Sequence, residues 1–175
     1  MNLPNRLTLL RIVLVPVICA CMVMQKGCMW IAAVLFAVAA VTDFADGKIA
    51  RSRNLITDFG KFMDPIADKL LVICPMILLV GLGRFPAWMC ALVVARELAV
   101  SGFRLVAALA DRVIAADKLG KYKTTCQIVC ILLLLLLPSR PWSYLGDLFA
   151  WAATILTVWS GAECIWKNRD LLADM

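Results

Sequence analysis

Four aspartates, in two pairs each spaced by about one helical turn, offer the chemistry of a divalent-metal site. Asp43 and Asp46 are three positions apart, and Asp64 and Asp68 are four positions apart, so each pair shares one face of a helix. Carboxylate oxygens suit magnesium and manganese, and two such ions would balance four negative charges. A pair of divalent ions stabilises both the attacking and the leaving oxygen of a phosphoryl-type displacement. We therefore predict a site for two Mg²⁺ or Mn²⁺ ions.

Apolar segments surround these aspartates. Hydrophobic residues make up 63% of the 175-residue chain, whereas a soluble domain is about half apolar. A charge deep in a membrane costs on the order of 3 kcal/mol, so carboxylates placed there need compensating charge. Neighbouring basic residues offer part of it: Lys48, Arg51, Lys61 and Lys69. The same composition argues against a soluble prenyl-diphosphate enzyme with aspartate-rich metal motifs.

The apolar runs predict an all-α, polytopic membrane protein with six transmembrane helices in one bundle and a polar cavity on its cytosolic side. We expect residues 1–175 to form a single membrane domain. The predicted spans are about Leu7–Met24, Cys28–Ala50, Asp64–Leu82, Phe85–Ala110, Leu119–Leu137 and Trp142–Trp166. The second and third spans reach the necessary length of about 20 residues only by including the aspartates.

The distribution of basic residues predicts the orientation of these spans. Of the 18 lysines and arginines, only Lys26, Arg84 and Arg140 lie on the connections after the first, third and fifth spans. Because cytoplasmic loops are enriched in lysine and arginine, both termini are expected in the cytosol. We expect an integral membrane protein, located in a bacterial inner membrane. The net charge of +6 is thus a topology signal. No groove-reading motif accompanies it, so no nucleic-acid partner is expected.

The acidic stretch resembles the signature of the CDP-alcohol phosphatidyltransferases, which reads D-x2-D-G-x2-A-R-x8-G-x3-D-x3-D. The sequence matches every fixed position, with Asp43, Asp46, Gly47, Ala50, Arg51, Gly60, Asp64 and Asp68. Fixed residues at these gaps make the resemblance far more specific than a single D-x2-D pair. The signature covers only residues 43–68, and the six predicted helices also fit the helical membrane fold of that family.

This resemblance implies transfer of a phosphatidyl group from CDP-diacylglycerol to an alcohol, with CMP leaving. The four aspartates are then the ligands of two divalent ions that hold the diphosphate of the CDP-lipid, and Asp68 is also the catalytic general base. The residues implied to contact the CDP-lipid are Asn5, Thr8, Gly47, Arg51 and Gly60. Arg11 matches the same N-terminal pattern. The family resemblance also implies a homodimer surrounded by membrane lipids.

Two positions leave a local alternative open. Asn5 would contact the nucleotide, but Asn2 or Asn5 would equally serve to cap the first helix. Pro65 follows a predicted metal ligand directly. It is compatible with the first turn of a helix capped by Asp64, or with a kink inside a longer helix.

Three segments outside the signature and one that overlaps its end resemble the branch of the family that uses glycerol 3-phosphate as the acceptor alcohol. They are NLPNRLTLLRIVLVPV, DPIADKLLV, ARELAVSGFR and KLGKYKTTCQ. An acceptor that carries a phosphate needs cations in the cavity. Arg96 and Arg104 are eight positions apart, within about 80° of each other around one helix, and Lys121 lies at the start of the next span. We predict that these three residues bind the acceptor phosphate.

Other interpretations of the charged residues remain. Topology and headgroup binding are the alternative for four basic residues: Arg104, Lys118, Lys121 and Lys123. Glu97 could orient Arg96 or another cation. Within the family, an inositol phosphate is the rival acceptor, because it too carries a phosphate. Outside the family, a divalent-cation transporter would explain the aspartates but not the spacing of Gly47, Arg51 and Gly60.

Overall fold

A computed structural model describes residues 3–24, 27–53, 58–109, 118–137 and 143–169 of the chain. Its side chains are described for 7–24, 27–43, 63–107, 119–137 and 144–169. Within these ranges the protein is all-helical, as the sequence predicts. The helices are α1 (Leu3–Met24), α2 (Met29–Arg53), α3 (Asp58–Gly81), α4 (Ala87–Leu109), α5 (Lys118–Leu136) and α6 (Ser143–Lys167).

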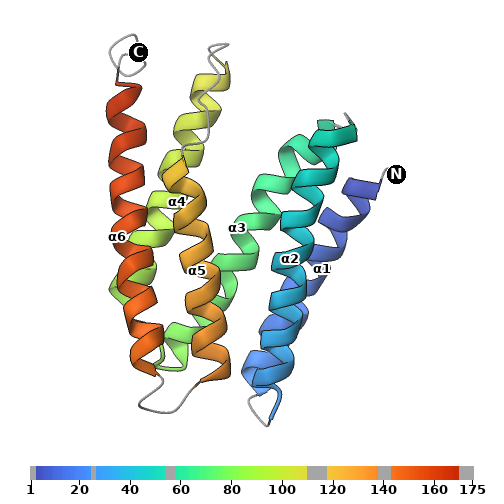
Figure 1. Ribbon diagram of the computed structural model, residues 1–175, viewed down its shortest axis with the longest axis vertical. Helices are drawn as coiled ribbons and strands as arrows, with labels where there is room; N and C mark the ends of the chain where they lie inside the picture. The colour runs from blue at the N-terminus through green and yellow to red at the C-terminus, as the bar shows by residue number, and fades with distance from the viewer. Residues whose placement is uncertain (1–2, 25–26, 54–57, 110–117, 138–142, 170–175) are drawn as a thin grey trace.

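The helices run alternately up and down, so chain segments far apart in sequence share one end of the bundle (Figure 1). The beginning of α1, the end of α2, the beginning of α3 and the ends of α4 and α6 lie toward the upper end of that view. Helix α1 packs against α2 and α3, while α6 packs against α4 and α5. Helix α5 also contacts α2 and α3, which joins the two groups of helices.

Glycine permits the sharp turn between α3 and α4. The φ angle of Gly83 is +68°, a left-handed conformation that side chains with a Cβ atom disfavour. The backbone N–H of Gly83 donates to the carbonyl of Val80, and that of Arg84 donates to Leu79, both at 2.9 Å. These bonds satisfy carbonyl groups at the helix end, so α3 closes cleanly before α4 begins.

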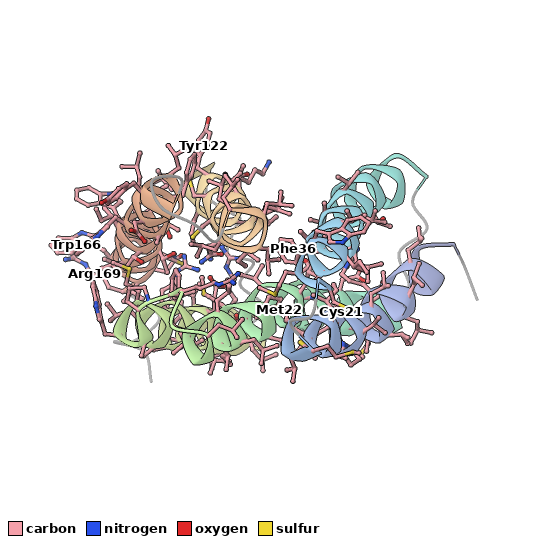
Figure 2. The ribbon with its side chains drawn as sticks, turned by 90° about the horizontal axis from the view of Figure 1, so that it is seen from below. Cys21, Met22, Phe36, Tyr122, Trp166 and Arg169 are labelled. Carbon is pink, nitrogen blue, oxygen red and sulfur yellow. The ribbon has the colours of Figure 1, made fainter. Side chains whose placement is uncertain are left out.

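The interior of the bundle is apolar, but polar residues are buried with it. The core includes Ile18, Phe36, Met76 and Ile131, all fully buried, and Figure 2 shows Met22 and Phe36 between the helices. Buried polar side chains are Thr8, Arg11, Lys123, Gln127, Thr154, Thr157 and Ser160. Meanwhile many large apolar side chains face outward, among them Val13, Val41, Leu98, Leu148 and Trp159. Outward-facing apolar residues over a partly polar interior are typical of a protein solvated by lipid.

Three helices in the described part of the chain are long and apolar enough to cross a membrane. They are Leu7–Met24, Leu119–Leu136 and Tyr144–Lys167. The part of α2 with described side chains, Met29–Asp43, is apolar but shorter, whereas charged residues interrupt the apolar runs of α3 and α4. The six-span arrangement therefore remains a prediction.

The helix bounds bear on both local alternatives, and they settle the one at Pro65. Helix α1 begins at Leu3, so Asn5 lies inside the first turn and is not its cap, while Asn2 lies outside the described residues. Helix α3 begins at Asp58, six positions before Asp64. Pro65 is therefore inside a longer helix, and Asp64 is not a helix cap.

Candidate active site

Three of the four predicted metal ligands meet the N-terminal half of α1. Thr8 donates a hydrogen bond to Asp64 Oδ1 at 2.5 Å. One turn later, Arg11 Nη1 donates to Asp68 Oδ1 at 2.9 Å, and its Nη2 lies 2.9 Å from Asp43 Oδ1. Because Thr8 and Arg11 share one face of α1, this face brings together carboxylates from α2 and α3.

Burial differs sharply across this cluster. The Arg11 side chain is only 3% exposed, whereas those of Asp43 and Asp68 are 34% and 47% exposed. Hydrogen bonds between charged groups are about twice as strong as neutral ones. The bonds from Arg11 to the two carboxylates therefore offset the free-energy cost of burying its guanidinium. The carboxylates keep an accessible side, which a substrate or ion can approach.

The remaining residues of the signature fall where only the helix assignment is described. Asp46, Gly47 and Arg51 belong to the last turns of α2, and Gly60 to the first turn of α3. Asn5 is in the first turn of α1. The side chains at these positions lie outside the described ones.

The chemistry of the donor set fits a divalent ion. The carboxylates of Asp43, Asp64 and Asp68 are hard oxygen donors, and both helices that carry them contact α1. Magnesium and manganese favour such ligands. Among the side chains that the structure describes, no group of three or more histidines, cysteines, aspartates or glutamates is arranged to hold a metal. The side chain of the fourth aspartate, Asp46, lies outside that set.

A second charged cluster joins α4, α5 and α6. Arg96 Nε donates to the backbone carbonyl of Thr157 at 3.1 Å, and Arg96 Nη2 donates to Ser160 Oγ at 2.8 Å. Arg96 Nη1 is also 3.7 Å from Glu97 Oε2. The guanidinium predicted to bind a phosphate is therefore braced against α6. Sequence reasoning missed Thr157 and Ser160, because neither stands out in an apolar helix.

Glu97 is the carboxylate at the centre of this cluster. Lys123 Nζ donates to Glu97 Oε1, and both side chains are largely buried. Arg104 is exposed on α4 and close enough to Arg96 and Lys123 to repel both electrostatically. Lys121 is exposed near the start of α5. Among the described side chains, Arg96 and Lys123 contact Glu97 and Arg104 lies near both of these cations, which leaves an excess of positive charge.

The close approach of α4 and α6 depends on a glycine. A Cβ atom added at Gly161 would lie 2.9 Å from Arg96 Cγ and 3.2 Å from Arg96 Nε. We expect Gly161→Ala to reduce the free energy of unfolding by about 1–3 kcal/mol relative to a matched Gly102→Ala variant. Gly102 is the control because a Cβ atom there meets nothing within 4 Å. Thermal unfolding in detergent measures the difference, and equal stability of the two variants would contradict the packing.

Known proteins resemble this chain over nearly its whole length. A model of the family described as CDP-alcohol phosphatidyltransferase matches residues 1–159. A Bacillus subtilis protein named CDP-diacylglycerol–glycerol-3-phosphate 3-phosphatidyltransferase is 44% identical over an alignment that covers 98% of this chain and 97% of its own. Proteins of the same name are each 39% identical: one from Rickettsia felis, covering 91% of both chains, and one from Shigella flexneri serotype 5b, covering 99% of this chain and 98% of its own. The chain belongs to the CDP-alcohol phosphatidyltransferase family.

Proposed function

We propose that the protein transfers the phosphatidyl group of CDP-diacylglycerol to glycerol 3-phosphate, which gives phosphatidylglycerophosphate and CMP. This is the activity of a phosphatidylglycerophosphate synthase, an enzyme of phospholipid biosynthesis. Similarity over nearly the whole chain to relatives named for this reaction supports the assignment. The observation on this chain that carries the choice of acceptor is the excess of positive charge around Glu97 on α4 and α5.

The reaction is a displacement at the lipid-side phosphorus. The acceptor hydroxyl oxygen forms a bond to that phosphorus, and the bond from phosphorus to the bridging oxygen of CMP breaks. Asp68 takes the hydroxyl proton as general base. Its half-exposed carboxylate is held through Oδ1 by Arg11, which fixes the side chain while leaving it open to the acceptor.

The four aspartates, Asp43, Asp46, Asp64 and Asp68, would hold two Mg²⁺ or Mn²⁺ ions. When bound, such ions neutralise the diphosphate and stabilise the attacking and leaving oxygens. The residues proposed on the CDP-lipid side are Asn5, Thr8, Gly47, Arg51 and Gly60. Thr8 supports this placement because it is anchored on Asp64, one of the proposed ligands.

Arg96, Arg104 and Lys121 are proposed to bind the acceptor phosphate. Arg96 is pre-oriented, because its bonds to Thr157 and Ser160 fix the guanidinium before a substrate arrives. Arg104 and Lys121 are exposed and free to close on a phosphate. A doubly charged phosphate would relieve the mutual repulsion of Arg104, Arg96 and Lys123.

Arg104→Ala gives the cleaner test of this phosphate site, because Arg96 also braces α6. We expect the KM for glycerol 3-phosphate to rise about 10–100-fold, as loss of a charge-assisted hydrogen bond implies, with a smaller effect on kcat. Steady-state kinetics with CDP-diacylglycerol at saturation measures both constants. Arg84→Ala, in the turn between α3 and α4, is the matched control. An unchanged KM in Arg104→Ala would show that the phosphate binds elsewhere.

Release of CMP by the purified protein tests the proposed function. With Mg²⁺ or Mn²⁺ and CDP-diacylglycerol, we expect release with glycerol 3-phosphate and little with serine or inositol phosphate. Release mainly with inositol phosphate would assign the rival acceptor. No release with any alcohol would refute the enzyme, and uptake of Mn²⁺ into vesicles in that case would favour the divalent-cation transporter.

The membrane arrangement is part of this proposal. We place a single six-span domain, residues 1–175, in a bacterial inner membrane, with both termini and the polar cavity on the cytosolic side and a homodimer as the assembly. Outward-facing apolar side chains support membrane insertion. The shared end of α1, α2, α3 and α4 supports one polar region on one side (Figure 1).

A further inference from the structure

Arg11 connects two proposed metal ligands that lie on different helices. Its Nη2 is 2.9 Å from Asp43 Oδ1 on α2, and its Nη1 donates to Asp68 Oδ1 on α3 at the same distance. The arginine is nearly fully buried, while both carboxylates are partly exposed. The guanidinium therefore holds the two carboxylates from the interior of the bundle.

An arginine is well suited to this position. Its guanidinium stays protonated and presents a rigid fork of donors, so one side chain can bind two carboxylates at once. Asp64 adds a third negative charge nearby. It accepts a hydrogen bond from Thr8, which lies one turn before Arg11 on α1. Without a cation among them these carboxylates would repel one another, and the acidic ends of α2 and α3 would separate. Arg11 supplies that cation from within the chain.

We propose that Arg11 is the internal counter-ion of the metal-free enzyme and that divalent ions compete with it for Asp43 and Asp68. The inference rests on the proposed role of these two aspartates as metal ligands. The competition arises because the Oδ1 oxygens that accept hydrogen bonds from Arg11 belong to the donor set an ion needs, and a carboxylate has few lone-pair sites. By linkage, Arg11 lowers the affinity for the ion as much as the ion weakens the hold of Arg11.

Arg11 is in this account a positioning residue, and its role differs measurably from that of a purely structural side chain. A structural side chain stabilises the fold by the same amount with and without metal. An internal counter-ion stabilises the metal-free protein most, and its removal makes the site bind metal more tightly. The discriminating quantity is therefore the Mg²⁺ concentration at the midpoint of thermal stabilisation.

The experiment follows unfolding of the full-length protein in detergent through its six tryptophans, first in EDTA and then at rising Mg²⁺. Arg11→Gln removes the charge and keeps a polar side chain of similar length. We expect its apparent Tm in EDTA to fall by about 10 °C and most of that loss to be recovered at saturating Mg²⁺. The Mg²⁺ midpoint should be at least about tenfold lower than in the wild type.

Two further variants make the comparison specific. Arg84→Gln removes an arginine that donates to the Leu134 carbonyl at 3.3 Å, and it should keep the wild-type Mg²⁺ midpoint. Arg11→Lys keeps the charge but loses the fork, so its midpoint should lie between those of the wild type and Arg11→Gln. This variant also carries the test if Arg11→Gln does not fold.

The possible outcomes separate this inference from the proposed function. An unchanged or higher Mg²⁺ midpoint in Arg11→Gln, or in Arg11→Lys if only that variant folds, would overturn the counter-ion role while leaving the metal site intact. If the wild type shows no Mg²⁺ stabilisation, or if Asp43→Asn retains all of it, the proposed metal site itself is wrong and the inference fails with it. A lowered midpoint that Arg84→Gln does not share supports the competition.

Discussion

Replacing Asp68 with asparagine is expected to lower kcat about 10³-fold, the size of effect that a general base supplies, while CDP-diacylglycerol still binds. Asparagine has the shape of aspartate but cannot take the acceptor proton. It also gives up the charge that pairs with Arg11 at 2.9 Å, so a modest loss of stability should accompany the loss of turnover. CMP release gives kcat, and quenching of tryptophan fluorescence by the CDP-lipid gives its Kd.

Asp147→Asn is the matched control for this change. Asp147 is exposed near the start of α6, and the start of this helix lies toward the lower end of Figure 1, opposite the shared end of α1, α2 and α3. It should leave both kcat and the Kd unchanged. If Asp68→Asn kept kcat within tenfold of the wild type, the general base would have to be another residue.

Replacing Lys123 with methionine should reduce the free energy of unfolding by about 3–5 kcal/mol, because it leaves a buried charge without its partner. Lys123 is 6% exposed and its partner Glu97 is 13% exposed. Arg96 Nη1, 3.7 Å from Glu97, is too distant to replace the lost hydrogen bond. Thermal unfolding in detergent should register the change as a fall in Tm of about 10 °C.

A second substitution separates loss of the ion pair from loss of packing. Adding Glu97→Gln to Lys123→Met removes the stranded carboxylate, so the double variant should recover much of the stability. Lys121→Met is the control, since Lys121 is exposed and its removal should change Tm little. If Lys123→Met were as stable as Lys121→Met, Glu97 and Lys123 would not form a stabilising pair.

Local periodicity explains what could be predicted from the sequence. Long apolar runs indicated helices throughout, and the described residues confirm an all-helical protein, although α1 and α3 begin at Leu3 and Asp58, before the predicted Leu7 and Asp64. Spacing also placed Asp64 and Asp68 on one face of a helix, which their shared contact with α1 fits. The fixed residues of the acidic signature identified the family, which the family match over residues 1–159 confirms.

Contacts between helices could not be predicted, because they depend on how each helix is rotated about its axis. Arg11 and Asp68 are 57 positions apart, and Arg96 and Ser160 are 64 apart. No local pattern states that such residues meet. A lone arginine early in an apolar span was the available signal for Arg11, since a buried charge in a membrane helix demands a partner. Arg96 carried the same signal. From the sequence we predicted that it binds the acceptor phosphate, but its hydrogen bonds to α6 were not predicted.

Counting bound Mn²⁺ by electron paramagnetic resonance tests the central claim most directly, that carboxylates from α2 and α3 hold paired divalent ions. The purified protein is titrated with Mn²⁺ in the presence of CDP-diacylglycerol, alongside Asp43→Asn and Asp64→Asn. The account predicts two Mn²⁺ per chain in the wild type and the loss of at least one in each variant. The account would be contradicted if the wild-type protein turned over fully while it bound no more Mn²⁺ than Asp43→Asn and Asp64→Asn do.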